Sequence, residues 1–174
     1  MEIHNNDEVF HIKLAKEDDL QIVLDLVVNA AEWLQSKNTT QWEYYLTNLE
    51  ENTPEIFDSI HNTYILMKDN IPVASVTLET SPNEWDRDIW GDEANEEGVI
   101  YLHRLVVHRN YAGVGLGTKL LEWSERFCAE KGNKAIRFDC LASNKGLNDF
   151  YQRRYKLKDI ANIYGQHSKY EVML

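Results

Sequence analysis

The spacing of apolar residues in the first third of the chain predicts one strand followed by two helices. Apolar and polar residues alternate from Val9 to Leu14, which is typical of a strand with one buried face. From Leu20 to Leu34 apolar residues recur every three or four positions, and the acids at 17–19 favour a helix start there. A second helical stretch is expected around Trp42–Glu51.

The central part of the chain changes to a strand-like pattern. Tyr64–Met67 and Val73–Glu79 are predicted to pair antiparallel around Asp69-Asn70, because Asp and Asn tolerate the left-handed backbone of a tight turn. The polar stretch from Thr80 to Gly98 is expected to form a long functional loop.

The remainder alternates strands and helices before two terminal strands. In order, we expect a strand at Val99–Val107, a helix from about Gly115 to Glu130 that ends at Lys131-Gly132, a strand at Lys134–Cys140, a short helix at Lys145–Arg153, and strands around Ile160 and Val172. This order predicts an α/β fold (α+β mixed), with a mixed sheet and helices on both faces. A chain of 174 residues fits one domain, which we expect to span residues 1–174.

Composition and charge limit the classes of partner. An apolar fraction of 43% and a charged fraction of 27% indicate a soluble globular protein. The net charge of −11 repels phosphate backbones, so no nucleic-acid partner is expected, whereas a cationic small molecule would be attracted unless the acids serve only solubility. No apolar run has the length of a signal peptide or membrane span, so a cytoplasmic protein without membrane attachment is expected.

The cysteines and most histidines show no pattern of a reactive or metal site. Cys128 and Cys140 fall on a predicted helix and strand and are expected to be buried apolar residues. No metal site is expected, because five histidines are scattered without ligand spacing: His4, His11, His61, His108 and His167.

A glycine-rich segment between a strand and a helix carries the candidate chemistry. Gly113, Gly115 and Gly117 alternate immediately before the predicted helix. Without Cβ atoms the backbone can approach a phosphate closely, and the helix start offers unpaired N–H groups. A tight turn needs only one such glycine, a Walker loop needs a different order, and a dinucleotide motif needs glycine where Thr118 stands.

The sequence VHRNYAGVGLGTKLL resembles motif A of the GNAT N-acetyltransferases, which is Gln or Arg, two residues, Gly, one residue, and Gly or Ala. The resemblance implies that acetyl-CoA is the cosubstrate and that main-chain N–H groups hold its pyrophosphate. Ala112 departs from the usual Arg or Gln, which removes one side-chain contact and implies a lower affinity. The segment implied to bind the cofactor comprises Ala112, Gly113, Val114, Gly115, Leu116, Gly117 and Thr118.

Downstream, ASNKGLNDFYQRRY resembles motif B of the same family. The resemblance implies that Asn144 contacts the pantetheine arm and that Tyr151 protonates the departing thiolate. From the residues alone, without motif A, Asn144 is most simply a helix N-cap and Tyr151 a core aromatic. Arg154-Tyr155 departs from the Gly-Phe common in relatives, which should alter the turn but not the fold.

The strand before the glycines holds a further candidate. By alternation Tyr101, His103, Leu105 and Val107 share one face with Val99, so His103 lies among apolar neighbours. A histidine there could accept the proton of an amine, or it could be a core histidine bonded to backbone. The family resemblance implies that main-chain groups of Leu105, Val106 and Val107 hold the pantetheine.

The resemblance implies an N-acetyltransferase that uses acetyl-CoA to acetylate a primary amine of a small molecule or of a peptide, and the net charge favours a cationic small molecule. The resemblance implies a mostly antiparallel sheet of six or seven strands, and homodimers are common in the family. A non-catalytic coenzyme A-binding regulatory module and a nucleotide-binding protein remain alternatives.

Overall fold

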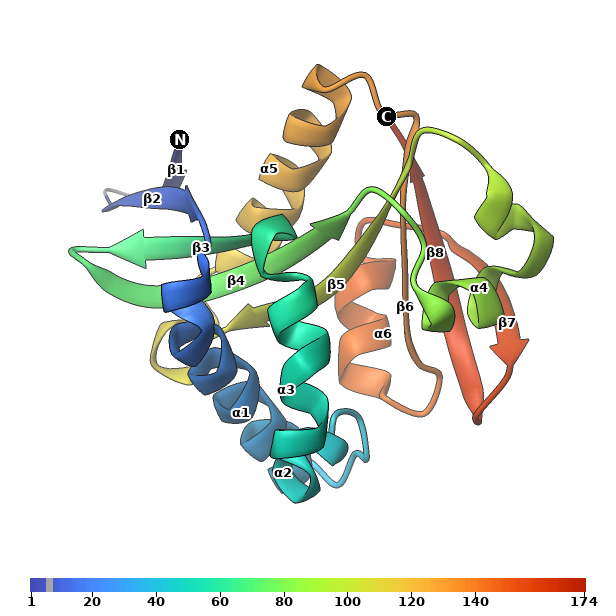
Figure 1. The fold of residues 1–174 in the computed structure, drawn as a ribbon, viewed down its shortest axis with the longest axis horizontal. Helices are drawn as coiled ribbons and strands as arrows, with labels where there is room; N and C mark the ends of the chain where they lie inside the picture. Colours follow the sequence, from blue (N-terminus) through green and yellow to red (C-terminus); the bar gives the residue numbers. More distant parts are fainter. Residues whose placement is uncertain (6–7) are drawn as a thin grey trace. The chain divides into compact units, whose positions relative to one another are not determined.

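A computed structural model describes residues 1–5 and 8–174 (Figure 1). These residues divide into two compact units. The first unit comprises Met1–Leu78 with His103–Ser124, and the second comprises Glu79–Leu102 with Glu125–Leu174. The chain passes from one unit to the other at the last residue of strand β4 (Ile71–Glu79), inside strand β5 (Val99–Val107) and inside helix α5 (Leu116–Glu130).

Among the described residues, two strands are followed by three α-helices and two more strands. Helix and strand then alternate before two final strands, and short 3₁₀ helices lie between these elements. The strands are β1 (Glu2–Asn5), β2 (Glu8–Leu14), β3 (Thr63–Lys68), β4 (Ile71–Glu79), β5 (Val99–Val107), β6 (Ala135–Leu141), β7 (Leu157–Asn162) and β8 (Gln166–Met173). The α-helices are α1 (Leu20–Ser36), α2 (Tyr44–Thr47), α3 (Leu49–Asp58), α4 (Glu84–Trp90), α5 (Leu116–Glu130) and α6 (Lys145–Gln152). The 3₁₀ helices are η1 (Glu17–Asp19), η2 (Ile60–Asn62), η3 (Gly91–Asn95) and η4 (Arg109–Tyr111).

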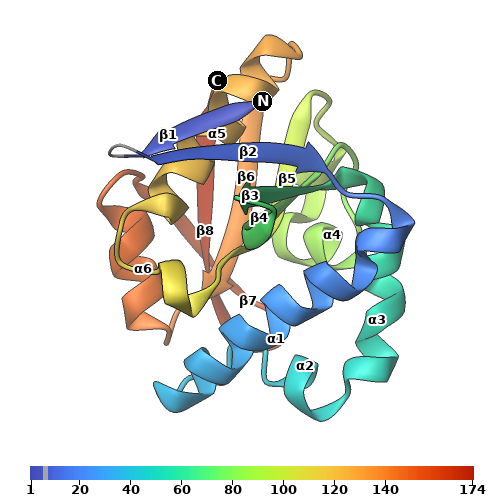
Figure 2. The ribbon, with the colours of Figure 1, turned by 90° about the vertical axis from the view of Figure 1, so that its left-hand side faces the viewer.

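The first unit is an antiparallel sheet covered on both faces by helices. β1 pairs with β2, β2 with β3 and β3 with β4, all antiparallel, and Figure 2 shows β2 extended beside β1. On one face the apolar side of α1 packs with α2, α3 and Ile65 of β3 into a buried cluster. On the other face Tyr64 of β3 contacts Trp123 of α5, with ring centroids 5.1 Å apart.

Periodicity explains α1 and the turn between β3 and β4. The buried residues of α1 have the three- and four-residue spacing expected of a helix with one apolar side: Val23, Leu24, Leu26, Val27, Ala30, Ala31 and Leu34. Asp69 and Asn70 have φ of 48° and 66°, which confirms the left-handed turn predicted there.

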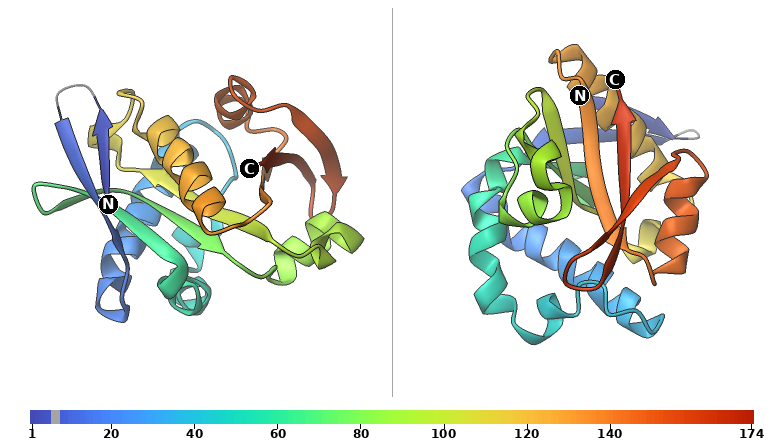
Figure 3. Two further views of the ribbon diagram at one scale, coloured as in Figure 1. Left: turned by 90° about the horizontal axis from the view of Figure 1, so that it is seen from above. Right: turned by 90° about the vertical axis from the view of Figure 1, so that its right-hand side faces the viewer.

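The second unit is built on mixed pairing. β5 runs parallel to β6 through Val99–Tyr101, whereas β6 pairs antiparallel with β8, and β8 with β7. The right-hand view of Figure 3 shows β6 and β8 side by side. Helix α6 covers one face of this pair, where Tyr151 packs against Phe138 and Tyr170.

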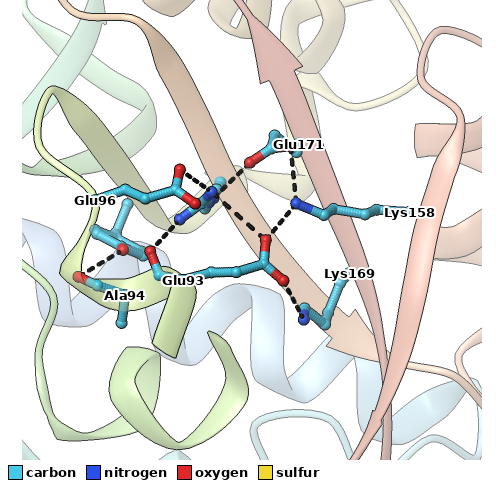
Figure 4. Close-up of polar contacts among 8 residues, drawn as sticks. Glu93, Ala94, Glu96, Lys158, Lys169 and Glu171 are labelled. Carbon is cyan, nitrogen blue, oxygen red and sulfur yellow. Dashed lines mark hydrogen bonds and ion pairs between the residues drawn. The ribbon is translucent and has the colours of Figure 1, made fainter. Parts of the chain in front are cut away.

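The opposite face of β6 and β8 carries charged residues beneath α4 and η3 (Figure 4). Arg137 is 1% exposed and bonds to Glu171 at 2.6 Å and to Glu96 at 2.7 Å. Lys158 also bonds to Glu171, at 2.8 Å, and the Arg137 guanidinium stacks over Trp90. Because each buried charge has an opposite partner, this face can be both charged and buried.

The structure corrects two predictions of secondary structure. Residues 80–98 are not one long loop, because α4 and η3 lie within them. The helical stretch predicted around 42–51 is two helices, α2 and α3, and Trp42 lies outside them with φ of 64°. α3 continues through Pro54, a residue that usually ends a helix.

The fold class itself is confirmed as α/β with a mixed sheet and helices on both faces. The described residues contain eight strands, whereas the family resemblance implied six or seven. β1 was not predicted, because its four residues are too few to show a period.

Candidate active site

The glycine loop between η4 and α5 is open and left-handed at two positions. Gly113 and Gly115 have φ of 83° and 88°, a region that side-chain-bearing residues rarely adopt. A Cβ placed on either glycine would meet no described atom within 4 Å. Residues 113–115 are exposed, so the main chain here is accessible to a ligand.

The loop leads directly into the N-terminus of α5. The N–H of Lys119 donates to the Gly115 carbonyl at 3.1 Å, so the N–H groups of Leu116, Gly117 and Thr118 precede the first helical hydrogen bond. The first N–H groups of a helix lack intrahelical acceptors and carry the positive end of its dipole. The predicted segment therefore has the form of an anion site.

Contacts from the rest of the first unit hold the loop in place. Asn5 donates from Nδ2 to the Val114 carbonyl at 2.9 Å, and the Arg109 N–H donates to Oδ1 of Asn29 at 3.0 Å. The Arg109 guanidinium lies 3.7 Å from the ring centre of Trp33, and burial lowers its pKa. These contacts orient the carbonyls and side chains without using the N–H groups of residues 113–118.

Ala112 differs from the other predicted cofactor residues. Its N–H donates to the Arg109 carbonyl at 3.2 Å, and its methyl side chain provides no polar group. Ala112 therefore has neither a free N–H group nor a polar side chain with which to bind a ligand, unlike the six residues that follow it.

The end of β5 carries the predicted pantetheine residues on an irregular strand. His103, Leu105 and Val107 are half-buried, and Val106 is buried against α1. Arg104 has a φ of 48°, which is left-handed, yet half-buried and buried residues still alternate from His103 to Val107.

Arg104 is a buried residue that sequence reasoning missed. It is 7% exposed, and its guanidinium bonds to Glu55 of α3 at 2.8 Å and to the Ser59 hydroxyl. A left-handed conformation at a residue other than glycine persists only when its surroundings hold it. The bonds to Glu55 and Ser59 provide that support, beside the strand residues predicted to contact the cofactor.

Asn144 and Tyr151 lie in the second unit, on α6. Asn144 is the N-cap of α6 and accepts a hydrogen bond from the Leu147 N–H at 3.2 Å, which confirms its capping role. Tyr151 is 5% exposed, and its ring packs against Phe138. Burial raises the pKa of the Tyr151 phenol well above 10, so it keeps its proton at neutral pH.

The turn after α6 is fixed by the residues that depart from the family pattern. Arg154 pairs with Glu125 at 2.8 Å, and the Tyr155 hydroxyl donates to the same carboxylate. Burial would raise the pKa of Glu125, but the hydrogen bonds from Arg154 and Tyr155 outweigh it and lower the pKa. The departure therefore replaces a Gly-Phe turn by a charged anchor to α5.

The cysteines are buried and free, as predicted. Burial raises the pKa of Cys128 to about 11 and that of Cys140 to about 12, so neither is a thiolate at neutral pH. Within the described residues, no helix is both long and apolar enough to span a bilayer, and no group of three or more His, Cys, Asp or Glu side chains could hold a metal ion.

Comparison with known proteins gives concordant results. The family model for the acetyltransferase (GNAT) family matches residues 27–155. The uncharacterized N-acetyltransferase YesJ of Bacillus subtilis strain 168 is 38% identical over 146 residues, which cover 83% of this chain and 79% of YesJ. A second relative, the uncharacterized N-acetyltransferase MJ1207 of Methanocaldococcus jannaschii, is 21% identical over 159 residues, covering 88% of this chain and 63% of that protein.

Solved structures share the fold over nearly the whole chain. A GNAT family acetyltransferase from Listeria monocytogenes 4b F2365 superposes with a TM-score of 0.82 and 25% identity, covering all of both chains. The PaiA N-acetyltransferase from Thermoplasma acidophilum, solved in complex with coenzyme A, has a TM-score of 0.72 and 16% identity over 95% of this chain and 99% of that one. The chain therefore belongs to the GNAT family of acetyltransferases.

Proposed function

We propose that this protein transfers the acetyl group of acetyl-CoA to a primary amine of a small molecule or peptide. The observation that carries the proposal is the exposed loop of Gly113–Gly115. The loop lies within the residues that match the family model and leads into the free N–H groups at the start of α5. A diphosphate is the part of acetyl-CoA that such a backbone recognises.

The donor half of the proposal uses main-chain groups. The N–H groups of residues 113–118 would bind the pyrophosphate, and those of Leu105 to Val107 the pantetheine arm. The side chain missing at Ala112 is expected to weaken this binding without abolishing it, because the remaining donors are backbone groups. The PaiA N-acetyltransferase, a protein of the same fold, was solved with coenzyme A bound, which supports acetyl-CoA as the donor.

The acid half of the proposal rests on Tyr151. A protonated, buried phenol can give its proton to the sulfur when the C–S bond breaks, and its raised pKa guarantees that the proton is present across the neutral range. Asn144, whose Oδ1 caps α6, fixes the start of the helix that carries Tyr151. The suggestion that Asn144 also contacts pantetheine stays a prediction.

The predictions on base, acceptor and domain remain open to test. His103 is half-buried in β5, so its role as proton acceptor stays a prediction. The net charge of −11 supports a cationic acceptor. We also propose that residues 1–174 fold as one domain, which requires a single cooperative unfolding transition.

Two measurements on the purified protein test the function. Calorimetry should show saturable binding of acetyl-CoA, and a thiol-detecting assay should show release of coenzyme A that depends on an added primary amine. Binding without amine-dependent release would support the non-catalytic module. Stabilisation by GTP or NAD but not by acetyl-CoA would support a nucleotide-binding protein instead.

A further inference from the structure

An imidazole–carboxylate pair lies on the face of β6 and β8 that is opposite Tyr151. Nδ1 of His167 in β8 is 3.0 Å from Oδ2 of Asp139 in β6. The other oxygen of Asp139, Oδ1, accepts a hydrogen bond from the Trp85 indole N–H at 3.1 Å. Both oxygens of this carboxylate are therefore engaged, which fixes its orientation toward His167.

The second ring nitrogen of His167 has no such partner. His167 is 5% exposed, and its Nε2 is buried without a hydrogen-bond partner among residues 1–5 and 8–174. A carboxylate at Nδ1 holds the proton on that nitrogen, so the neutral ring presents a lone pair at Nε2. A buried polar atom without a partner is costly unless a ligand uses it.

Two aromatic rings form the outer wall of this pair. The Trp85 ring lies edge-on to His167, with centroids 4.9 Å apart, and the Tyr164 ring stacks on Trp85 at 5.7 Å. Tyr164, in the turn between β7 and β8, is 73% exposed and is held by one hydrogen bond to Asp88 at 3.2 Å. Aromatic faces flanked by carboxylates attract an ammonium group.

We infer that His167 accepts the proton of the acceptor amine, that Asp139 positions it, and that Trp85 and Tyr164 receive the substrate as a primary alkylammonium. This inference rests on the proposed acetyltransferase function and adds to it the base and the chemical class of the acceptor. The exposed Tyr164 ring covers Trp85 through one ring stack and is tied to Asp88 by one hydrogen bond, so a substrate that reaches the Trp85 face breaks these two contacts.

The proton and electron pairs balance in this scheme. The ammonium gives one proton to Nε2 of His167, and its nitrogen lone pair then forms the C–N bond to the thioester carbonyl carbon. The C–S bond breaks with its electron pair on sulfur, and Tyr151 gives its proton to the thiolate. The second nitrogen proton leaves to solvent as the amide forms, and the Tyr151 phenolate regains a proton from solvent. The imidazolium later releases its proton to solvent.

The two faces of the β6–β8 pair keep acid and base apart. Phe138 and Tyr170 face Tyr151, whereas Asp139 and His167 lie on the other face with Arg137. The two groups therefore act on different atoms of the reacting pair, Tyr151 on the sulfur and His167 on the nitrogen.

Among the described residues, Asp139 faces His167 from β6. Behind Trp85 lies Tyr164 of the turn, which interacts with Asp88 and Glu84 of α4. Lys169, two residues along β8 on the same face, points to Trp90 and to Glu93 of η3. Asp139 is therefore the negatively charged group in direct contact with His167 that would stabilise its imidazolium form.

The test compares histidine variants in the acetylation of putrescine, spermidine and benzylamine. His167→Asn keeps a donor for Asp139 but removes the base, so it should lower kcat/KM at neutral pH by about 100-fold or more and abolish the fall of rate toward acid pH. His61→Asn, at an exposed histidine of η2, is the matched control and should retain the wild-type profile. Acetyl-CoA affinity should change less than about threefold in both variants, which is under 1 kcal/mol of binding free energy.

Three outcomes would overturn parts of this account. A His167→Asn enzyme with the wild-type acid limb and near wild-type rate overturns the inference and leaves the acetyltransferase function intact. Loss of the acid limb in His103→Asn instead assigns the base to β5. A wild-type protein that binds no acetyl-CoA or acetylates none of the amines overturns the proposed function, and the inference with it.

Nitrogen NMR of the wild-type protein tests the same site without relying on a variant that folds. The inference predicts that the neutral His167 ring carries its proton on Nδ1 and leaves Nε2 unprotonated. A neutral ring protonated on Nε2 contradicts it. Asp139→Asn should shift this tautomer balance, as expected for a positioning residue, and should lower kcat more than it raises KM.

Discussion

Replacing Gly115 by alanine adds one methyl group to the loop that precedes α5. No described atom lies within 4 Å of the position that this methyl carbon would occupy, so the change causes no clash within the protein. The backbone there has a φ of 88°, which alanine adopts only with strain. The substitution therefore has two separable effects, a strained backbone and a methyl group in the space offered to the pyrophosphate.

The size of each effect follows from its cause. A left-handed residue with a Cβ costs about 1–2 kcal/mol of unfolding free energy. In a chain of this length that lowers Tm by roughly 2–8 °C. Loss of one hydrogen bond to a charged phosphate oxygen costs about 1.5–3 kcal/mol, so acetyl-CoA should bind about 10- to 100-fold more weakly.

Gly132 provides the matched control, because it follows the other end of α5 with a φ of 81° and equally open surroundings. Gly132→Ala should lose as much stability as Gly115→Ala in thermal unfolding, yet bind acetyl-CoA as the wild type does in calorimetry. Equal affinities for the two variants would refute the reasoning, because they would show that the methyl group of Gly115→Ala meets no ligand.

Other predictions concern the acid, the charged face and the cysteines. Tyr151→Phe should lower kcat by about 100-fold or more with little change in acetyl-CoA affinity. Because burial raises the Tyr151 pKa well above 10, Tyr151 does not ionise between pH 7 and 10, so any loss of wild-type rate in that range should persist in the variant. Glu171→Gln should destabilise the fold at pH 7 by about 1.5–3 kcal/mol in urea unfolding, because Arg137 loses a charged partner. Burial raises the Glu171 pKa, but hydrogen bonds from Lys158 and Arg137 outweigh this and lower it. The stability that the carboxylate contributes is therefore present above its ordinary pKa and is lost as the pH falls. The difference in unfolding free energy between wild type and Glu171→Gln should shrink toward acid pH, and a difference independent of pH would contradict this. Cys128 and Cys140 should resist iodoacetamide in the folded protein at pH 8, and modification at the rate of a free thiol would contradict their burial.

The parts of the fold that the sequence predicts are those with a long, clear period or a fixed motif. β5 has the predicted bounds, and α5, β6 and α6 differ from prediction by a residue or so. The glycine loop was identified because alternating glycines between a strand and a helix have few structural uses, and the structure gives Gly113 and Gly115 the left-handed φ that glycine supplies.

The helix α4 was missed although a local signal is present. Asn83 caps it by accepting from the Asp86 N–H at 2.8 Å, and Asp86 accepts in return from the Asn83 N–H at 3.0 Å. The surrounding acids obscured the apolar spacing of Trp85, Ile89 and Trp90. A search for capping residues before the polar stretch would have found the helix.

The buried polar contacts could not be predicted, because they depend on strand register. Asp139 and His167 are 28 residues apart and meet only because β6 and β8 pair so that Leu141 lies opposite His167. In the sequence Arg104 is a charged residue within an apolar strand. Its partner Glu55 can be identified only from the folded structure. Sequence patterns give the face of a residue but not its neighbour across a sheet.

Backbone NMR during titration with acetyl-CoA tests most directly whether the main chain of the glycine loop binds the diphosphate. The account predicts that the amide resonances of residues 113–118 move most, and that a pantetheine thioester lacking the diphosphate leaves them unmoved. Amide shifts in residues 113–118 that are no larger than those elsewhere, at saturating acetyl-CoA, would contradict it.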